Sequence, residues 1–133
     1  MKWTAILIAL SATLTQANPL KTEPLAARDF DGEVSCGGDL PAQRDSISDG
    51  IDYLNGVGGT PAQDPNSCGR VSCSYNSAIY MCNDNDETQY LASFATLASG
   101  AQKILDECSS GMDVVGTVKA PNGWGVQVKY ASC

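Results

Sequence analysis

The sequence predicts an α+β fold in which an antiparallel sheet of about four strands, built from two hairpins, carries two helices on one face. Two strand-turn-strand patterns, at residues 68–82 and 114–133, alternate with two patterns of helical period. Six cysteines accompany them, enough for three disulfides. The order helix, hairpin, helix, hairpin therefore favours a two-layer sandwich stapled by three bridges.

The first residues have the form of a secretion signal. Lys2 gives a positive start, residues 5–14 are apolar, and Thr15-Gln16-Ala17 offers small residues for cleavage. A membrane anchor would need about 20 apolar residues, roughly twice the length of this run. We therefore predict a signal peptide at residues 1–17 and a secreted, extracellular protein without stable membrane insertion.

Residues 18–35 contain two prolines, mixed charge and no apolar period, which predicts a flexible arm or a propeptide. Arg28 is a candidate processing site, with an uncleaved tail as the alternative. The remaining residues, 36–133, are expected to form a single disulfide-stapled domain.

The cysteines are expected to be structural, because oxidising compartments favour disulfides over metal or redox chemistry. The sequence does not choose among the pairings. They are Cys36, Cys68, Cys73, Cys82, Cys108 and Cys133.

A short helix is predicted after Cys36. Asp39 can cap it, Pro41 fits its first turn, and Asn55-Gly56 can end it. Its apolar stripe consists of Ile47, Ile51 and Leu54.

The segment from Cys68 to Cys82 is predicted to be a hairpin whose tight turn is Asn76-Ser77. With that turn, Cys73 and Cys82 fall on the same face of the hairpin. Since it holds half of the cysteines, we expect it to anchor the rest of the chain through bridges to Cys36, Cys108 and Cys133.

A longer helix follows, with Gly111 as its stop signal. Its predicted stripe is Tyr90, Leu91, Phe94, Leu97, Ala98, Ala101, Ile104, Leu105 and Cys108. Cys108 lies on this stripe, so we expect it to face the core and form a disulfide there.

The last segment, 114–133, is predicted to be a second hairpin with Pro121-Asn122-Gly123 as its turn. Alternation places Trp124, Val126, Val128 and Tyr130 on one face of its second strand. Trp124 and Tyr130 are read as core residues rather than as an aromatic binding surface. Tyr75, near the first hairpin's tip, is instead a candidate partner surface.

These features together resemble a family of proteins. A secretion signal precedes a cysteine and a short helix, followed by Cys68-Gly-Arg-Val-Ser-Cys-Ser-Tyr-Asn-Ser-Ala-Ile-Tyr-Met-Cys-Asn-Asp, a long helix ending at a cysteine, and the strands Gly116-Thr-Val-Lys and Trp124-Gly-Val-Gln-Val. This order resembles small cysteine-rich secreted fungal proteins, namely the extracellular necrosis-inducing effector family and the related killer-toxin-like α/β sandwiches. The resemblance covers residues 36–133.

The resemblance implies a secreted fungal protein that acts extracellularly on a host plant or a competing microbe by binding, without catalysis. The implied partner is an unknown host or microbial extracellular protein or glycan, and we expect a monomer. Killer toxins of this shape are thought to act through basic surface residues, whereas this chain is acidic, so no functional residue is carried over. The alternative function is an extracellular inhibitor or a protective carbohydrate-binding module.

Composition excludes several function classes. The chain has a formal charge of −7, or −8 once Lys2 is removed, which argues against nucleic acid as a partner. It contains no histidine, which excludes Ser-His-Asp and Cys-His catalysis and the usual zinc sites. We therefore expect no enzyme and no cofactor. A compact hydrolase using carboxylates alone would require two of them facing each other in a cleft.

The acidic segment Asn83-Asp-Asn-Asp-Glu87 has two interpretations. Its oxygen ligands suit calcium, although it lacks the loop length, central glycine and distal glutamate of an EF-hand. The preferred interpretation is a cap for the long helix, with Asp86 and Gln89 in capping-box spacing.

Overall fold

The computed structural model describes residues 30–133. This part of the chain is α+β, with two helices, antiparallel sheets and three disulfides, which confirms the predicted class and bridge count. The main sheet has five strands rather than about four. The predicted signal peptide, its cleavage after Ala17 and the Arg28 processing site lie outside the described residues.

The elements alternate between short strands, longer strands and helices. In chain order they are β1 (Glu33–Cys36), β2 (Ala42–Gln43), α2 (Arg44–Gly56), β3 (Ala62–Gln63), β4 (Ser67–Ser74), β5 (Ser77–Asn83), β6 (Gln89–Tyr90), α3 (Phe94–Cys108), β7 (Ser109–Ser110), β8 (Asp113–Val114), β9 (Gly116–Lys119) and β10 (Trp124–Tyr130).

The main sheet joins the two predicted hairpins through their inner strands. Its order is β1-β9-β10-β5-β4, so the β4–β5 and β9–β10 hairpins meet where β10 pairs with β5. The register of that pair runs from Trp124 opposite Asn83 to Tyr130 opposite Ser77. Two smaller sheets, β2-β8-β7 and β3-β6, lie beside it.

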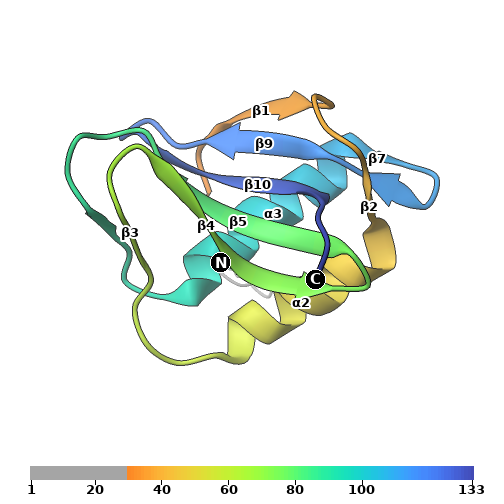
Figure 1. Cartoon of the computed structure of the whole chain (residues 1–133), viewed down its shortest axis with the longest axis horizontal. Coiled ribbons are helices and arrows are strands. Elements are labelled where there is room, and N and C mark those ends of the chain that lie inside the picture. The colour runs from red at the N-terminus through yellow and green to blue at the C-terminus, as the bar shows by residue number, and fades with distance from the viewer. Residues whose placement is uncertain (1–29) are drawn as a thin grey trace, which may run out of the picture.

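The core lies between this sheet and both helices, which lie behind the sheet in Figure 1. Alternate residues of the two central strands are fully buried, because every second side chain of a strand faces the same side. Each buried aliphatic side chain contributes about 2 kcal/mol. The central residues from the sheet are Ile79, Met81, Val118, Val126 and Val128.

Each helix carries a buried glycine where it approaches the sheet most closely. A Cβ atom on Gly50 would lie 2.7 Å from Ser72 Oγ, and one on Gly100 would lie 2.7 Å from Val126 Cγ2. Both distances are shorter than side-chain contacts allow. The glycines therefore permit α2 to pack close to β4 and α3 to pack close to β10, at some cost in helix propensity.

The folded domain begins before Cys36, inside the segment that the sequence assigned to an arm. Residues Glu33–Cys36 form β1, which pairs with β9 and ends the sheet on one side. Phe30 packs edge-on against Trp124, with 5.6 Å between the ring centres. A short polar strand at an edge carries no periodic apolar signal, which is why the sequence did not reveal it.

The α2 stripe was predicted correctly but its start was wrong. Ile47, Ile51 and Leu54 are buried, whereas the helix begins at Arg44 with Gln43 as its N-cap. Asp39 does not cap it, because the chain first forms β2; its carboxylate instead accepts a hydrogen bond from Gln127 at 3.4 Å. Tertiary pairing of β2 with β8 thus overrides the local capping signal.

The start of α3 was also predicted too early. The helix begins at Phe94 with Ser93 as its N-cap, so Asp86 and Gln89 do not form a capping box. Tyr90 belongs to β6, pairs with Ala62 and is 69% exposed rather than buried. Tyr90 matched the 3.6-residue apolar period of the helix by coincidence, although it belongs to a short strand.

The turn of the β4–β5 hairpin lies one residue earlier than predicted. Ser74 pairs with Ser77, so the two turn residues are Tyr75 and Asn76, not Asn76 and Ser77. Both turn residues have positive φ, 50° and 58°, as in the type I′ turns that suit the twist of hairpins. Val71 forms a bulge in β4, between Arg70 and Ser72, which shifts the register of β4 against β5 by one residue.

The disulfides join Cys36 to Cys108, Cys68 to Cys82 and Cys73 to Cys133. Cys108 forms a disulfide at the end of α3, as predicted. The prediction that the β4–β5 hairpin anchors the whole chain was wrong. One bridge closes the hairpin on itself, one ties the C-terminus to it, and Cys36–Cys108 does not involve it.

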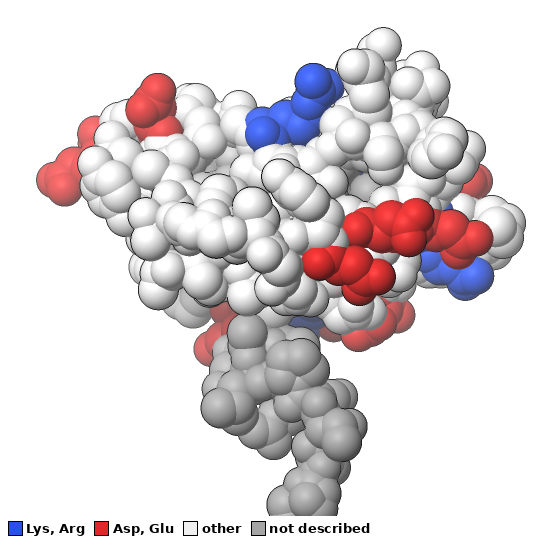
Figure 2. Space-filling view, turned by 90° about the horizontal axis from the view of Figure 1, so that it is seen from below, with Lys and Arg blue, Asp and Glu red and all other residues white. Residues whose placement is uncertain are grey.

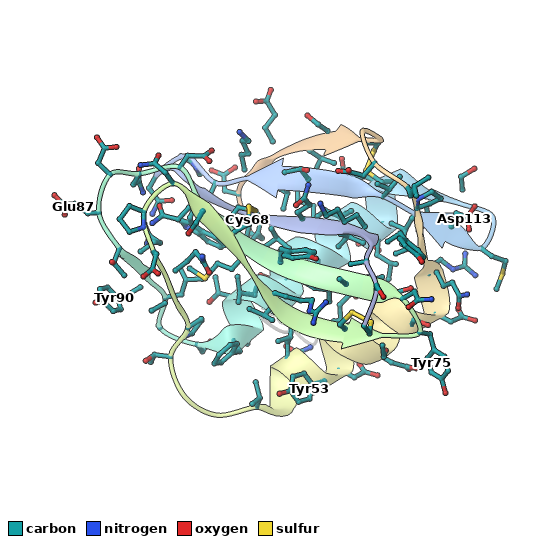
Figure 3. The ribbon with its side chains drawn as sticks, viewed as in Figure 1. Tyr53, Cys68, Tyr75, Glu87, Tyr90 and Asp113 are labelled. Atoms are coloured by element: carbon teal, nitrogen blue, oxygen red, sulfur yellow. A yellow bond between two sulfur atoms is a disulfide. The ribbon has the colours of Figure 1, made fainter. Side chains whose placement is uncertain are left out.

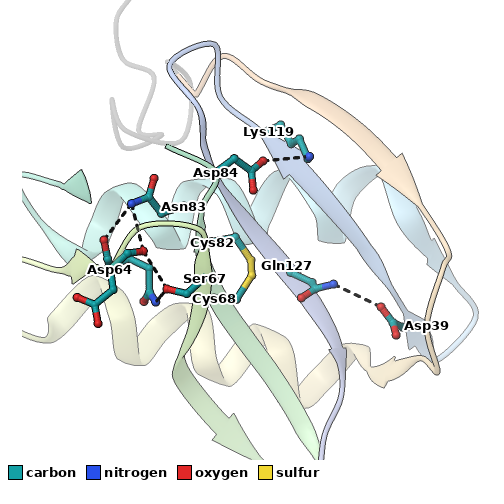
Figure 4. The surroundings of a disulfide bond; sticks show 10 residues. Asp39, Asp64, Ser67, Cys68, Cys82, Asn83, Asp84, Lys119 and Gln127 are labelled. Carbon is teal, nitrogen blue, oxygen red and sulfur yellow. Dashed lines mark hydrogen bonds and ion pairs between the residues drawn. A yellow bond between two sulfur atoms is a disulfide. The ribbon is translucent and has the colours of Figure 1, made fainter. Parts of the chain in front are cut away.

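A buried asparagine holds the loops at one end of the sheet (Figure 4). The Nδ2 group of Asn83, fully buried, donates to the carbonyl oxygens of Gln63 at 3.0 Å, Asp64 at 3.2 Å and Glu87 at 2.8 Å. Its Oδ1 accepts from the backbone amide of Asn85 at 2.9 Å. Asn83 therefore satisfies backbone groups of two loops at once.

The disulfides should differ in their contribution to stability. The residues they join are separated by 72 positions for Cys36–Cys108, 60 for Cys73–Cys133 and 14 for Cys68–Cys82. Loop entropy predicts that paired replacement by alanine costs about 4 kcal/mol for either long bridge and about 3 kcal/mol for the short one. Guanidinium unfolding of the three paired variants measures the order, and a largest loss at Cys68–Cys82 would contradict it.

Replacing Asn83 by alanine should lower the free energy of unfolding by about 2–3 kcal/mol, because it leaves buried carbonyls without a donor. Asn122, an exposed turn residue, provides the control, and its alanine variant should lie within about 0.5 kcal/mol of the parent. Denaturant unfolding with the bridges intact compares the two. Equal losses would show that Asn83 has no special role.

Candidate functional site

The acidic segment 83–87 does not cap α3, which begins several residues later at Phe94. It is tied to its neighbours: Asp84 pairs with Lys119 at 3.2 Å, Asn85 Nδ2 donates to the carbonyl of Asn122, and Asn66 Nδ2 donates to Asp86. Within residues 30–133, no group of three or more Cys, Asp or Glu side chains is placed to hold a metal ion. The segment's contacts are those of a loop fastened to the sheet.

No helix in the described part of the chain is both long and apolar enough to cross a membrane.

An open groove runs between α2 and β4. Its volume is about 380 Å³. Gly50 has no side chain, so α2 and β4 pack closely at the floor of the groove. The side chains of Asp49 and Tyr53 form its helix side. We call it the edge groove; its lining residues are Asp49, Gly50, Tyr53, Val71, Ser72, Cys73 and Ser74.

The exposed surface of α2 beside the edge groove is acidic. Asp49 lies one turn from both Asp45 and Asp52, and all three are exposed. No ion pair joins this acidic face, defined by these three residues, to a basic side chain within residues 30–133. Figure 2, which views the molecule from the α2 side, shows acidic side chains gathered in a band across this surface.

Two exposed tyrosines flank the same side of the molecule. Tyr75, the predicted partner residue, lies at the hairpin tip and is 78% exposed. Tyr53, on α2, is 58% exposed. Figure 3 shows both along the margin formed by α2 and β4, whereas Tyr90 lies at the opposite end of the molecule.

Tyr75 occupies an unusual backbone conformation. Its φ of 50° places a bulky aromatic residue in the left-handed region, which glycine and asparagine adopt far more readily. Its side chain gains little burial in return. A residue that is locally costly and contributes little packing is a candidate for a role outside folding.

The aromatic residues of β10 divide between core and surface. Trp124 is 7% exposed and belongs to the core, as predicted, but Tyr130 is 45% exposed, so its assignment to the core was wrong. Tyr130 ends the strand, where its backbone amide donates to the carbonyl of Leu40. By strand alternation it shares the face of the core residues, but it is half exposed at the strand end.

The other face of the main sheet is polar. One cross-strand row follows the register through all five strands: Ser35, Thr117, Gln127, Tyr80 and Arg70. Lys129 stands above the Tyr80 ring, 5.3 Å from its centre. Arg70 donates to the carbonyl of Ser132, so the C-terminal residues cover part of this face.

Tyr75 was proposed from the sequence as a partner residue and is exposed, whereas Asp49 and Tyr53 were not proposed. Their spacing does carry a signal: Asp45, Asp49 and Tyr53 follow at intervals of four, which places them in a row on one helix. Only the three-dimensional fold shows that Asp49 and Tyr53 lie beside β4.

Comparison of the chain with protein-family models, with curated proteins and with solved structures found no match.

Replacing Tyr75 by asparagine should raise the free energy of unfolding by about 1 kcal/mol, because asparagine tolerates the left-handed conformation better. Tyr90→Asn serves as the control at another exposed tyrosine, one with no positive φ, and should give no gain. Thermal and denaturant unfolding of both variants measure the difference. A loss of stability in Tyr75→Asn would show that the ring stabilises the fold.

Proposed function

We propose that this protein is a secreted, disulfide-stapled effector or toxin-like protein that acts outside the cell by binding a partner, without catalysis. Three disulfides within residues 30–133 suit an oxidising, extracellular environment. The resemblance of the motif order to fungal necrosis-inducing effectors suggests a host plant or competing microbe as the target. The partner would be an extracellular protein or glycan, bound by a monomer.

We also infer the two-layer sandwich arrangement of the killer-toxin-like proteins. The placement of both helices behind the five-stranded sheet in Figure 1 supports it. The same arrangement leaves the opposite sheet face and the β4 edge as surfaces for a partner.

The observation that carries a binding function is the surface around the edge groove. It combines two exposed tyrosines with carboxylates that form no ion pair within residues 30–133, and tyrosine is a frequent residue at the centre of protein interfaces. Tyr75 is attached to the Cys73–Cys133 bridge through a single intervening residue, Ser74. The disulfide therefore restrains the position of Tyr75, although the Tyr75 side chain itself is not packed in the core.

The second candidate function, a carbohydrate-binding protective module, would use the polar sheet face. Tyr80 with its neighbouring Lys129, together with the amide of Gln127 and the hydroxyl of Thr117, supplies the aromatic and hydrogen-bonding groups that sugars require. Retention of the protein on insoluble chitin, cellulose or glucan, lost in Tyr80→Ala, would favour this function over the first.

The proposed function predicts cell death on infiltration of the purified, oxidised protein into leaves, and none from protein reduced and alkylated at all six cysteines. Tyr75→Asn, expected to fold, should reduce the response strongly, whereas Tyr90→Asn should not. Dose series in several plant hosts, beside growth assays on competing fungi, measure it. Equal activity of the alkylated protein, or no activity in any assay, would contradict the proposal.

A further inference from the structure

Within the part of the chain that the structure describes, no strand covers the edge of the main sheet at β4. Within residues 30–133, β4 is the last strand in the sheet order, so only β5 pairs with it along its length. Ser74 and Ser77 flank a two-residue turn, and pairs in such a hairpin alternate between hydrogen-bonded and non-hydrogen-bonded. By this alternation the backbone N–H and C=O of Cys73 point away from β5, toward the open edge.

The edge groove lies directly along this edge. Four consecutive β4 residues, Val71–Ser74, form one wall, and α2 forms the other through Asp49 and Tyr53. A strand added to β4 would thus lie between an existing strand and a helix, with its alternate side chains facing α2. The opposite edge strand, β1, has only four residues.

The negative charge beside the groove indicates what kind of peptide it would bind. Among residues 30–133, Asp49 is the one charged residue in the groove lining, with Asp45 and Asp52 one turn away on either side. Of the basic residues on these two elements, Arg44 lies in the first turn of α2, and Arg70 is bound to Ser132 on the polar sheet face. The carboxylates beside the groove therefore favour lysine or arginine on the incoming strand.

From these three observations we propose that the edge groove binds an extended, basic peptide segment of a partner protein by strand addition to β4. This inference rests on the proposed binding function and names the chemistry of the partner. Backbone hydrogen bonds to the regular part of β4 on the hairpin side of the Val71 bulge, centred on Cys73, would provide affinity for any extended segment, and Asp49 with its neighbours would select basic ones. Tyr53 would cover the segment from the helix side.

The experiment is an NMR titration of the oxidised, full-length folded domain with a short acetylated and amidated peptide of alternating lysine and valine. Strand addition predicts saturable shifts in Val71–Ser74 and slowed amide exchange at Cys73. The matched peptide of glutamate and valine should not bind. Spermine, which carries positive charge without a peptide backbone, should not protect the Cys73 amide.

Protein variants test the charge. Asp49→Asn should weaken peptide binding about threefold, and the triple variant Asp45→Asn, Asp49→Asn, Asp52→Asn at least about tenfold, from the range measured for exposed ion pairs. A control triple variant, Asp31→Asn, Asp106→Asn, Asp113→Asn, removes the same charge from exposed sites outside the groove and should leave binding nearly unchanged. Circular dichroism verifies that both triple variants fold.

Peptide variants test the backbone. Because only alternate amides of an added strand face β4, N-methylation of one alternate set should abolish binding while methylation of the other set preserves it. Equal binding of both methylated peptides, equal effects of the two triple variants, protection at β1 instead of β4, or Cys73 protection by spermine would each overturn the inference.

The outcomes separate this inference from the proposed function. Leaf or antifungal activity that persists in the Asp45, Asp49, Asp52 triple variant, without peptide binding to the parent protein, would overturn the groove assignment alone. Peptide binding at β4 by a protein with no activity on any plant or microbe would support the groove assignment and contradict the effector role.

Discussion

The pairing of β5 with β10 is the interaction on which the rest of the structure depends. Each strand belongs to a hairpin that can form locally, and only their seven-residue register unites the hairpins into one sheet. That register aligns Met81 with Val126 and Ile79 with Val128, which creates a continuous apolar face. Both helices are stable because they cover this face, since helices of this length are marginal in isolation. The three disulfides then stabilise the edges of an arrangement that the burial of apolar side chains determines.

Periodic segments of the sequence were predictable, and their ends were not. The stripe of Ile47, Ile51 and Leu54 and the second hairpin with its Pro121-Asn122-Gly123 turn follow from local patterns alone. The starts of α2 and α3 are instead set by two-residue strands, β2 and β6, whose partners lie far away in the chain. Such short pairings leave no periodic pattern in the sequence. The capping signal at Asp39 and the apolar residue Tyr90 therefore led to helix starts that were predicted too early. The disulfide pairing likewise required the fold.

The candidate site was predictable only in part, because its components come from different levels of structure. Tyr75 could be recognised as exposed, since a residue at a hairpin tip has little to pack against. The edge groove could not, because it arises from the packing of α2 against β4, which Gly50 makes close enough. Asp49 and Tyr53 share a helical row in the sequence, but nothing in that row reveals what lies opposite. A groove between a helix and a strand can be recognised only when the positions of both elements are known.

The surface around the edge groove is unfavourable for stability in several respects. Tyr75 adopts a left-handed backbone conformation, and the carboxylates of Asp45 and Asp49 repel each other one turn apart. Helix α2 also has no basic residue in its last turn to offset its negative end. These costs total about 2 kcal/mol, less than one disulfide supplies. The missing basic residue is shared by α3, but the conformation of Tyr75 and the repulsion between Asp45 and Asp49 both lie beside the edge groove. Their concentration there favours function over folding as their cause.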